Sequence, residues 1–125
     1  MARILLVDDE PMLRRTLRII LEKAGHEVTE AGDGDQALLM FDEDKPDMVI
    51  TDIVMPNREG VETIREMRRL DTRLPIIAMS GGANTGGDLF LRLASLLGAN
   101  TTLSKPIRQA VLLEAVDACL AGGAS

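Results

Sequence analysis

Short apolar runs alternate regularly with longer segments of helical periodicity along this chain. This alternation limits the possible folds more than its composition does. The first run, Arg3–Val7, is apolar after its first residue and stops at two aspartates, which is typical of a strand buried on both faces. The period then changes, and Leu17, Ile20 and Leu21 recur at helical spacing until Gly25. The same change recurs along the chain, so the sequence predicts strands that alternate with helices.

Five strands and five helices are predicted in this way. Strand–helix alternation favours a mainly parallel sheet with helices on both faces, and right-handed crossovers leave few topologies. We therefore expect an α/β protein with a doubly wound sheet in three layers. The predicted strands are Arg3–Val7, Glu27–Ala31, Met48–Thr51, Ile76–Met79 and Thr101–Ser104. The predicted helices are Pro11–Ala24, Ala37–Phe41, Val61–Met67, Leu89–Leu97 and Val111–Leu120.

Length and charge limit the function. The 125 residues suit one domain, with a core over about 3–120 and a tail over Ala121–Ser125. The net charge of −6 argues against direct nucleic-acid binding and is compatible with divalent cations. Cys119 is the single cysteine, so it forms no internal disulfide, is expected in the core and fits a reducing compartment. The N-terminal apolar run is too short for a signal peptide or membrane span, so we expect a cytoplasmic protein that does not bind membranes.

Polar side chains follow four of the predicted strands. In an open parallel sheet, ligands bind beyond the carboxyl ends of the strands, so these side chains converge on one edge. Any one of them alone is explained as a helix cap or turn residue. Together, three carboxylates repel one another, and one lysine cannot neutralise all three. The residues are Asp8 and Asp9 after the first strand, Asp52 after the third, Ser80 after the fourth and Lys105 after the fifth.

This set of side chains predicts a phosphoryl-transfer site that depends on Mg²⁺, with Mn²⁺ as a substitute. Carboxylate oxygens suit such hard cations, and Asp8 and Asp9 are expected to hold the ion beside the phosphoryl oxygens. Asp52 is an oxygen nucleophile that can form an aspartyl phosphate. Lys105 is expected to pair with a further phosphate oxygen, and Ser80 to donate a hydrogen bond to the same group.

Four segments carry a family resemblance. They are ILLVDDEP, MVITDIVMPNREG, IIAMS and TLSKPI, in this order and spacing. They resemble the receiver domains of bacterial two-component response regulators, of the chemotaxis-regulator type. The resemblance covers the chain from Ile4 to about Leu120. It implies a flavodoxin-like fold, in which a five-stranded parallel sheet of order 2-1-3-4-5 is flanked by five helices.

The resemblance also implies a role for each acid. It makes Asp52 the phosphoacceptor, which receives its phosphoryl group from a histidine kinase or a histidine phosphotransfer protein. It makes Asp8 and Asp9 the pair that binds Mg²⁺, with Asp52 and the backbone carbonyl of Val54 as further ligands.

A switch is implied by the same resemblance. Ser80 is the hydroxyl that moves toward the phosphoryl group, and the bond between Lys105 and Pro106 is expected to be cis. Receiver domains usually have an aromatic switch residue where this chain has Thr102, which has no large ring to swing between two positions. We therefore expect the glycine-rich segment Gly81–Gly87 to be mobile without phosphorylation and to become ordered with it.

Several surface expectations follow. The fourth helix, fifth strand and fifth helix are implied as the face for a downstream protein target, or for a homodimer after phosphorylation. Leu91 points away from an apolar stripe that we expect to be buried. The expected stripe consists of Leu89, Phe90, Leu93, Leu96 and Leu97. The last predicted helix carries a second apolar stripe, which consists of Val111, Leu112, Ala115, Val116, Cys119 and Leu120.

His26 is expected to be exposed. Arg14, Arg15 and Arg18 are expected to form a solvated face that helps to dock the donor protein.

Two other functions remain open on the residues alone. One is a Mg²⁺-dependent phosphatase of the haloacid-dehalogenase type, whose pattern has a second aspartate where this chain has Val54. The other is a receiver-like scaffold that is never phosphorylated. We favour a signalling domain over a turnover enzyme. The sequence leaves open whether the chain is a stand-alone receiver or part of a longer regulator.

Overall fold

The computed structural model describes residues 2–53, 60–81, 92, 95–96 and 98–122. Within these residues it has five strands and four helices. The helix expected over Leu89–Leu97 lies mostly outside them. The elements are β1 (Arg3–Val7), α1 (Pro11–Lys23), β2 (Glu27–Ala31), α2 (Gly34–Asp44), β3 (Met48–Asp52), α3 (Gly60–Leu70), β4 (Ile76–Ser80), β5 (Thr101–Ser104) and α5 (Gln109–Gly122).

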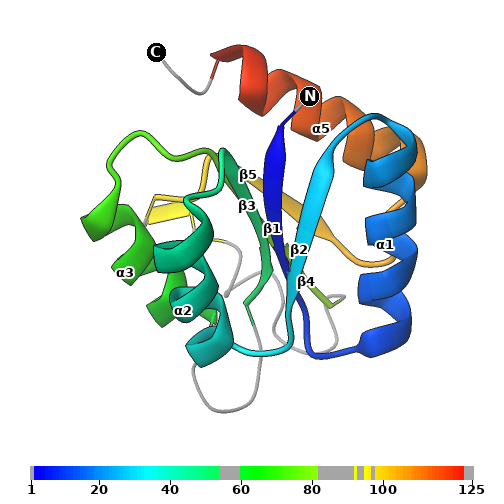
Figure 1. Cartoon of the computed structure of the whole chain (residues 1–125). Coiled ribbons are helices and arrows are strands. Elements are labelled where there is room, and N and C mark those ends of the chain that lie inside the picture. The colour runs from blue at the N-terminus through cyan, green and yellow to red at the C-terminus, as the bar shows by residue number, and fades with distance from the viewer. Residues whose placement is uncertain (1, 54–59, 82–91, 93–94, 97, 123–125) are drawn as a thin grey trace.

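The five strands form one parallel sheet in the order β2-β1-β3-β4-β5. Helices α2 and α3 cover one face, and α1 and α5 cover the other (Figure 1). The doubly wound, three-layer architecture and the strand order are therefore confirmed. The order reverses between β1 and β3, and such a switch point is where a crevice opens beyond the strand ends. A ligand site is therefore expected at the carboxyl ends of β1 and β3.

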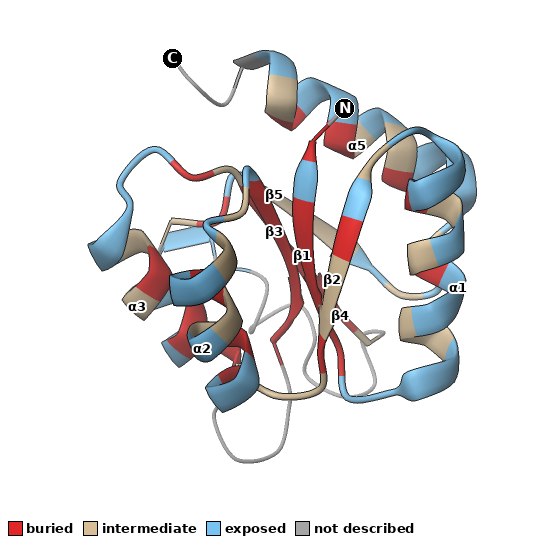
Figure 2. Cartoon of the chain, viewed as in Figure 1, coloured by how far each residue is buried: buried red, intermediate tan, exposed pale blue. Residues whose placement is uncertain are grey.

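The core consists of two apolar layers, one on each face of the sheet. Successive side chains of a strand point to opposite faces. Leu5 and Val7 therefore pack toward α2 and α3, whereas Ile4 and Leu6 pack toward α1 and α5. Figure 2 shows the buried central strands of the sheet between helices whose outer faces are exposed. Cys119 is a buried free thiol in the second layer, as expected. No helix in the described residues is long and apolar enough for a membrane span.

Local sequence explains where the helices start. Pro11 occupies the first turn of α1, where its missing N–H removes no hydrogen bond. The Asp33 side chain accepts a hydrogen bond from the backbone N–H of Gln36 and caps α2. The last helix extends to Gly122, two residues into the expected tail, because Ala121 favours helix.

Two expectations about apolar side chains are wrong. Leu96 is 83% exposed and does not belong to a buried stripe. It lies next to exposed Ser95 and one helical turn from exposed Arg92, so it shares their solvent-facing side. Val111, expected on the buried side of the last helix, is 44% exposed, whereas Leu112 and Val116 are buried.

The expectations for His26 and the arginines also need correction. His26 is half-buried, and its Nδ1 accepts a hydrogen bond from the backbone N–H of Ala2 at 3.1 Å. Arg14 and Arg18 are not simply solvated, because each forms an ion pair with Glu30 at 2.7 Å. Strand β2 lies beside α1 and brings Glu30 to both arginines, a tertiary contact that helical periodicity does not reveal.

Candidate functional site

Four carboxylates meet at the carboxyl ends of β1 and β3. Asp8 and Asp9 directly follow β1, and Asp52 is the last residue of β3. Glu10 joins them, and one oxygen from each of the four lies within 4.8 Å of the others. Asp8 and Asp52 are buried, whereas Asp9 and Glu10 are exposed. The fold thus brings the three predicted acids together. The sequence prediction missed Glu10, although its position directly after Asp8 and Asp9 could have indicated that it belongs to the cluster.

Lys105 connects this cluster to β5. Its Nζ lies 3.0 Å from Oδ2 of Asp52, 3.0 Å from Oδ2 of Asp8 and 3.2 Å from Oε1 of Glu10. Burial by itself lowers the pKa of Lys105, whereas the contacts with the Asp8 and Asp52 carboxylates raise it. The rise is larger than the decrease, so the pKa of Lys105 lies above its usual value. The ammonium is therefore charged at neutral pH and partly offsets the four carboxylates.

Two buried oxygens in this region have unused hydrogen-bonding capacity. The Oδ1 atom of Asp8 accepts a hydrogen bond from the backbone N–H of Glu10 at 2.9 Å. Its Oδ2 atom is near Lys105 Nζ but makes no hydrogen bond, and the Oγ atom of buried Ser80 has no hydrogen-bond partner. Such groups are costly unless a ligand or ion satisfies them, and they cluster at functional sites.

The start of α3 packs tightly against the strand that carries Asp52. The backbone N–H of Gly60 donates to the carbonyl oxygen of Ile53 at 3.1 Å. A Cβ atom added to Gly60 would lie 2.2 Å from the carbonyl oxygen of Asp52 and 2.3 Å from Cα of Ile53. Only glycine fits this close approach, which fixes the helix beside the strand that carries Asp52.

The remaining predicted site residues are placed as follows. Thr102 lies half-buried in β5, opposite Ala78 of β4. The bond between Lys105 and Pro106 is cis, as expected. Val54 lies outside the described residues, as do residues 82–87 of the glycine-rich segment.

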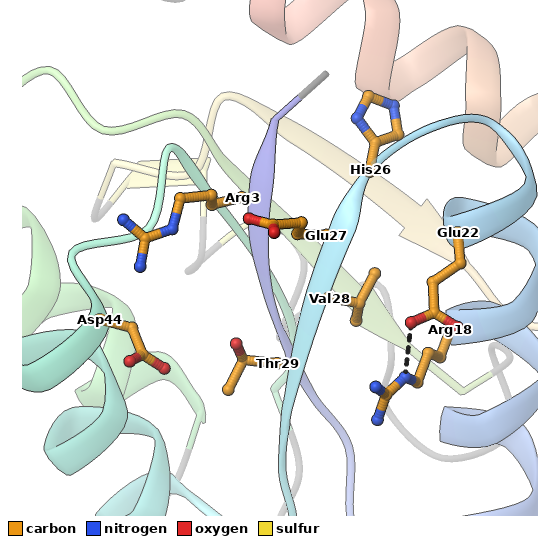
Figure 3. Close-up of a pocket in the computed structure, with 8 residues that line it drawn as sticks. All are labelled: Arg3, Arg18, Glu22, His26, Glu27, Val28, Thr29 and Asp44. Carbon is orange, nitrogen blue, oxygen red and sulfur yellow. Dashed lines mark hydrogen bonds and ion pairs between the residues drawn. The ribbon is translucent and has the colours of Figure 1, made fainter.

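A pocket also lies at the outer edge of β2, and none of the four clustered acids lines it (Figure 3). Its lining includes Arg3 and Arg18 as well as Glu27 and Asp44, so it carries charges of both signs. The arrangement does not favour a small anion or a small cation.

The cluster is therefore rich in carboxylate oxygens and lies beside the half-buried ammonium of Lys105. Carboxylate oxygens alone suit a hard divalent ion rather than a softer metal. Lys105 could donate to an oxyanion beside Asp52, and the unpartnered hydroxyl of Ser80 lies at the end of the neighbouring strand β4. Acidic side chains bridged by a lysine at the switch point of a doubly wound sheet could accommodate a cation and an oxyanion side by side.

Comparisons with known proteins give the family. The chain belongs to the response regulator receiver domain family, whose family model matches residues 4–117. Proteins of this family are signalling domains of two-component systems, and membership does not favour the haloacid-dehalogenase alternative. "Protein PilH" of Pseudomonas aeruginosa is 34% identical over 124 residues, which cover 98% of this chain and 100% of that protein. "Chemotaxis protein CheY" of Thermotoga maritima is 35% identical, with 92% and 94% covered.

Solved structures agree with this assignment. A CheY-like receiver domain protein from Methanospirillum hungatei superposes with a TM-score of 0.89 at 27% identity, covering 98% of this chain and 96% of that one. NtrX from Brucella abortus gives a TM-score of 0.90 at 29% identity, but the chain covers only 27% of it. The chain likewise spans 53% of the transcriptional regulatory protein AfsQ1 of Streptomyces coelicolor, so related domains occur both alone and within longer regulators.

Proposed function

We propose that this receiver domain is a phosphorylation switch, in which Asp52 accepts a phosphoryl group from a phosphohistidine donor in a Mg²⁺-dependent reaction. The observation that carries the proposal is the position of Lys105. Its Nζ lies 3.0 Å from Oδ2 of both Asp52 and Asp8, at the carboxyl edge of the sheet. A half-buried ammonium beside the acceptor carboxylate supports the binding of an incoming oxyanion.

The side chains of this pocket have complementary roles in the transfer. A carboxylate oxygen of Asp52 attacks phosphorus, a P–O bond forms while the P–N bond of the donor breaks, and the electron pair stays on the imidazole nitrogen. Lys105 exchanges a carboxylate contact for a phosphoryl oxygen and keeps its proton, because its pKa is raised. The hydroxyl of Ser80, which has no partner in the described structure, donates to another phosphoryl oxygen.

The donor set fits Mg²⁺. The carboxylates of Asp8, Asp9 and Asp52 would hold the ion, together with the backbone carbonyl of Val54. Glu10 supplies a further carboxylate beside them. When bound, Mg²⁺ supplies positive charge that neutralises the phosphoryl oxygens during transfer.

The proposed output is a change of surface. Ser80 lies on β4 and Thr102 lies on β5. We expect phosphorylation to act through these two residues and the segment Gly81–Gly87. The face that changes would be formed by the predicted helix Leu89–Leu97 together with β5 and α5. The partners are a histidine kinase or histidine phosphotransfer protein as donor and a protein target, or a second copy, as receiver of the signal. A cytoplasmic location is part of the proposal, and the free thiol of Cys119 fits a reducing compartment.

Phosphorylation with acetyl phosphate tests the proposal. We expect the intact mass of the protein to increase by one phosphoryl group when Mg²⁺ is present, and the gain to be lost in Asp52→Asn or with a chelator. Asp44→Asn, which removes a half-buried carboxylate outside the cluster, is the matched control and should keep the gain. A gain that persists in Asp52→Asn contradicts the proposed acceptor. Absence of both a mass gain and beryllofluoride binding in the wild-type chain contradicts the switch itself.

A further inference from the structure

Arg14 of α1 is bonded to the backbone beside the acidic cluster. Its Nη1 donates to the carbonyl oxygen of Asp8 at 2.7 Å, and its Nε donates to Oε1 of Glu30 at 2.7 Å. The side chains of Arg14 and Glu30 are only 20% and 22% exposed, so both contacts are largely shielded from water. Within the described residues, no ion pair joins Arg14 to the four clustered carboxylates. Its contact with the site is therefore through the backbone.

The carbonyl that Arg14 binds belongs to the peptide group between Asp8 and Asp9. A peptide group is planar, so fixing its oxygen also fixes the N–H of Asp9. On the other side, the N–H of Asp8 donates to the carbonyl oxygen of Ala31 at 3.1 Å, which ties the end of β1 to β2. The Asp9 carboxylate forms no hydrogen bond or ion pair with described residues. Its direction thus depends on the backbone that Arg14 holds.

A second arginine keeps this arrangement in place. Oε2 of Glu30 accepts a hydrogen bond from Nη1 of Arg18 at 2.7 Å. This bond is the main reason why the pKa of Glu30 is lowered, and the bond from Arg14 lowers it to a smaller extent. Arg18 is itself paired with Glu22 at 3.1 Å, the contact drawn in Figure 3. Gly32 lies beside the guanidinium of Arg14, since a Cβ atom on it would lie 3.4 Å from Nη1 of Arg14.

We propose that Arg14 is a positioning residue that aims Asp9 at the divalent cation through the Asp8–Asp9 peptide. The inference rests on the proposed function and deepens it. The direct effect of a positive charge near a cation site is to weaken binding, so removing that charge should tighten it. Positioning predicts the opposite, because partners that orient metal ligands typically contribute about 10- to 100-fold in affinity. The direction of the change therefore separates the two effects.

Three variants of the full chain test the inference. Arg14→Lys keeps the charge but loses the planar fork that reaches Asp8 and Glu30 together. Arg14→Gln removes the charge as well, and Arg15→Gln removes the same charge from the exposed neighbouring position. Mg²⁺ affinity is measured by calorimetric titration. We expect both Arg14 variants to bind Mg²⁺ roughly 10-fold more weakly, and Arg15→Gln to bind it as tightly as the wild type or slightly more so.

A measurement without metal completes the test. We expect Arg14→Lys to shift the amide resonance of Asp9 in the ¹H–¹⁵N spectrum of the metal-free protein, while α5 amides stay unchanged. Unaltered or tighter Mg²⁺ binding in Arg14→Gln overturns the inference, as does an unshifted Asp9 amide in Arg14→Lys. If an Arg14 variant unfolds, Glu30→Gln releases the same guanidinium and is measured in its place. If the wild-type chain binds no Mg²⁺, the proposed function fails, whereas the Asp9 amide still reports on Arg14.

Discussion

At the scale of single residues, the site is a balance between buried acids and one ammonium. Asp8 is fully buried and Asp52 is 4% exposed, and both contact Lys105, whose side chain is 13% exposed. Two carboxylates at this depth repel each other unless a cation lies between them. In the described structure Lys105 is that cation, which explains why its proton is held more tightly than usual.

Replacing Lys105 should therefore destabilise the metal-free protein. We expect Lys105→Met to lower the free energy of unfolding by roughly 3–5 kcal/mol, because the variant leaves buried carboxylates without their partner. Addition of Mg²⁺ should recover part of the loss. Urea unfolding followed by far-ultraviolet circular dichroism is the suitable measurement, since the chain has no Trp or Tyr. Lys23→Met, at an exposed position, is the control, with an expected change within about 0.5 kcal/mol. Equal stability of the two variants contradicts this account.

At the scale of elements, helices position the strand ends that carry the site. The clearest case is α3, which starts at Gly60 against the last residues of β3. The same helix also fixes the chain before β5. Nη2 of Arg68 donates to the carbonyl oxygen of Gly98 at 2.7 Å and to Oδ1 of Asn100 at 3.0 Å. Asn100 in turn accepts a hydrogen bond from the backbone N–H of Ile76 at the start of β4. Helix α3 therefore links β3, β4 and the entry to β5.

A methyl group at the start of α3 tests the first of these contacts. Gly60→Ala places its Cβ against the backbone of Asp52 and Ile53, which cannot move aside without shifting β3. We expect a loss of about 1–3 kcal/mol in the free energy of unfolding, the usual cost of overpacking. Gly32→Ala is the control, because its Cβ would meet only side-chain atoms at 3.4 Å and should cost about 0.5 kcal/mol or less. A Gly60→Ala protein as stable as this control would show that α3 can shift freely.

At the scale of the whole molecule, an acidic chain concentrates negative charge at one edge of its sheet. The net charge is −6, and four carboxylates share the carboxyl ends of β1 and β3. The two apolar layers hold these strand ends in place, so the acids cannot separate without disrupting the core. A folded chain of this kind should bind a divalent cation that the unfolded chain does not bind.

Mg²⁺ should therefore raise the thermal midpoint of the whole protein. A ligand that binds only the folded state raises the free energy of unfolding by roughly 2.7 kcal/mol when its concentration is 100 times the dissociation constant. Differential scanning calorimetry at increasing MgCl₂ measures the effect, with NaCl at equal ionic strength as the control for screening. Asp9→Asn should reduce the dependence on Mg²⁺ because it removes one ligand. An equal rise with NaCl would attribute the effect to screening and contradict a specific site.

The sequence predicted the fold and the five proposed site residues, but not the contacts that surround them. Asp8, Asp9, Asp52, Ser80 and Lys105 were recognised because parallel strands end at one edge, so a residue's place after its strand indicates its place in space. The interactions of Arg14 with Glu30 and with the Asp8 carbonyl had no such signal. They join residues on different elements, and helical spacing made Arg14 look like a solvated side chain.

The types of the strands and helices, the burial of the sheet between two helical layers and the edge where polar residues gather were all predictable from the amino-acid sequence. These properties follow from the period of apolar residues, which is local. The contacts of Lys105 with Asp8 and Asp52, the place of Glu10 in the cluster and the exposure of Leu96 became apparent only in the folded molecule. Distances between side chains on separate elements depend on how helices and strands pack, and no local pattern encodes that packing.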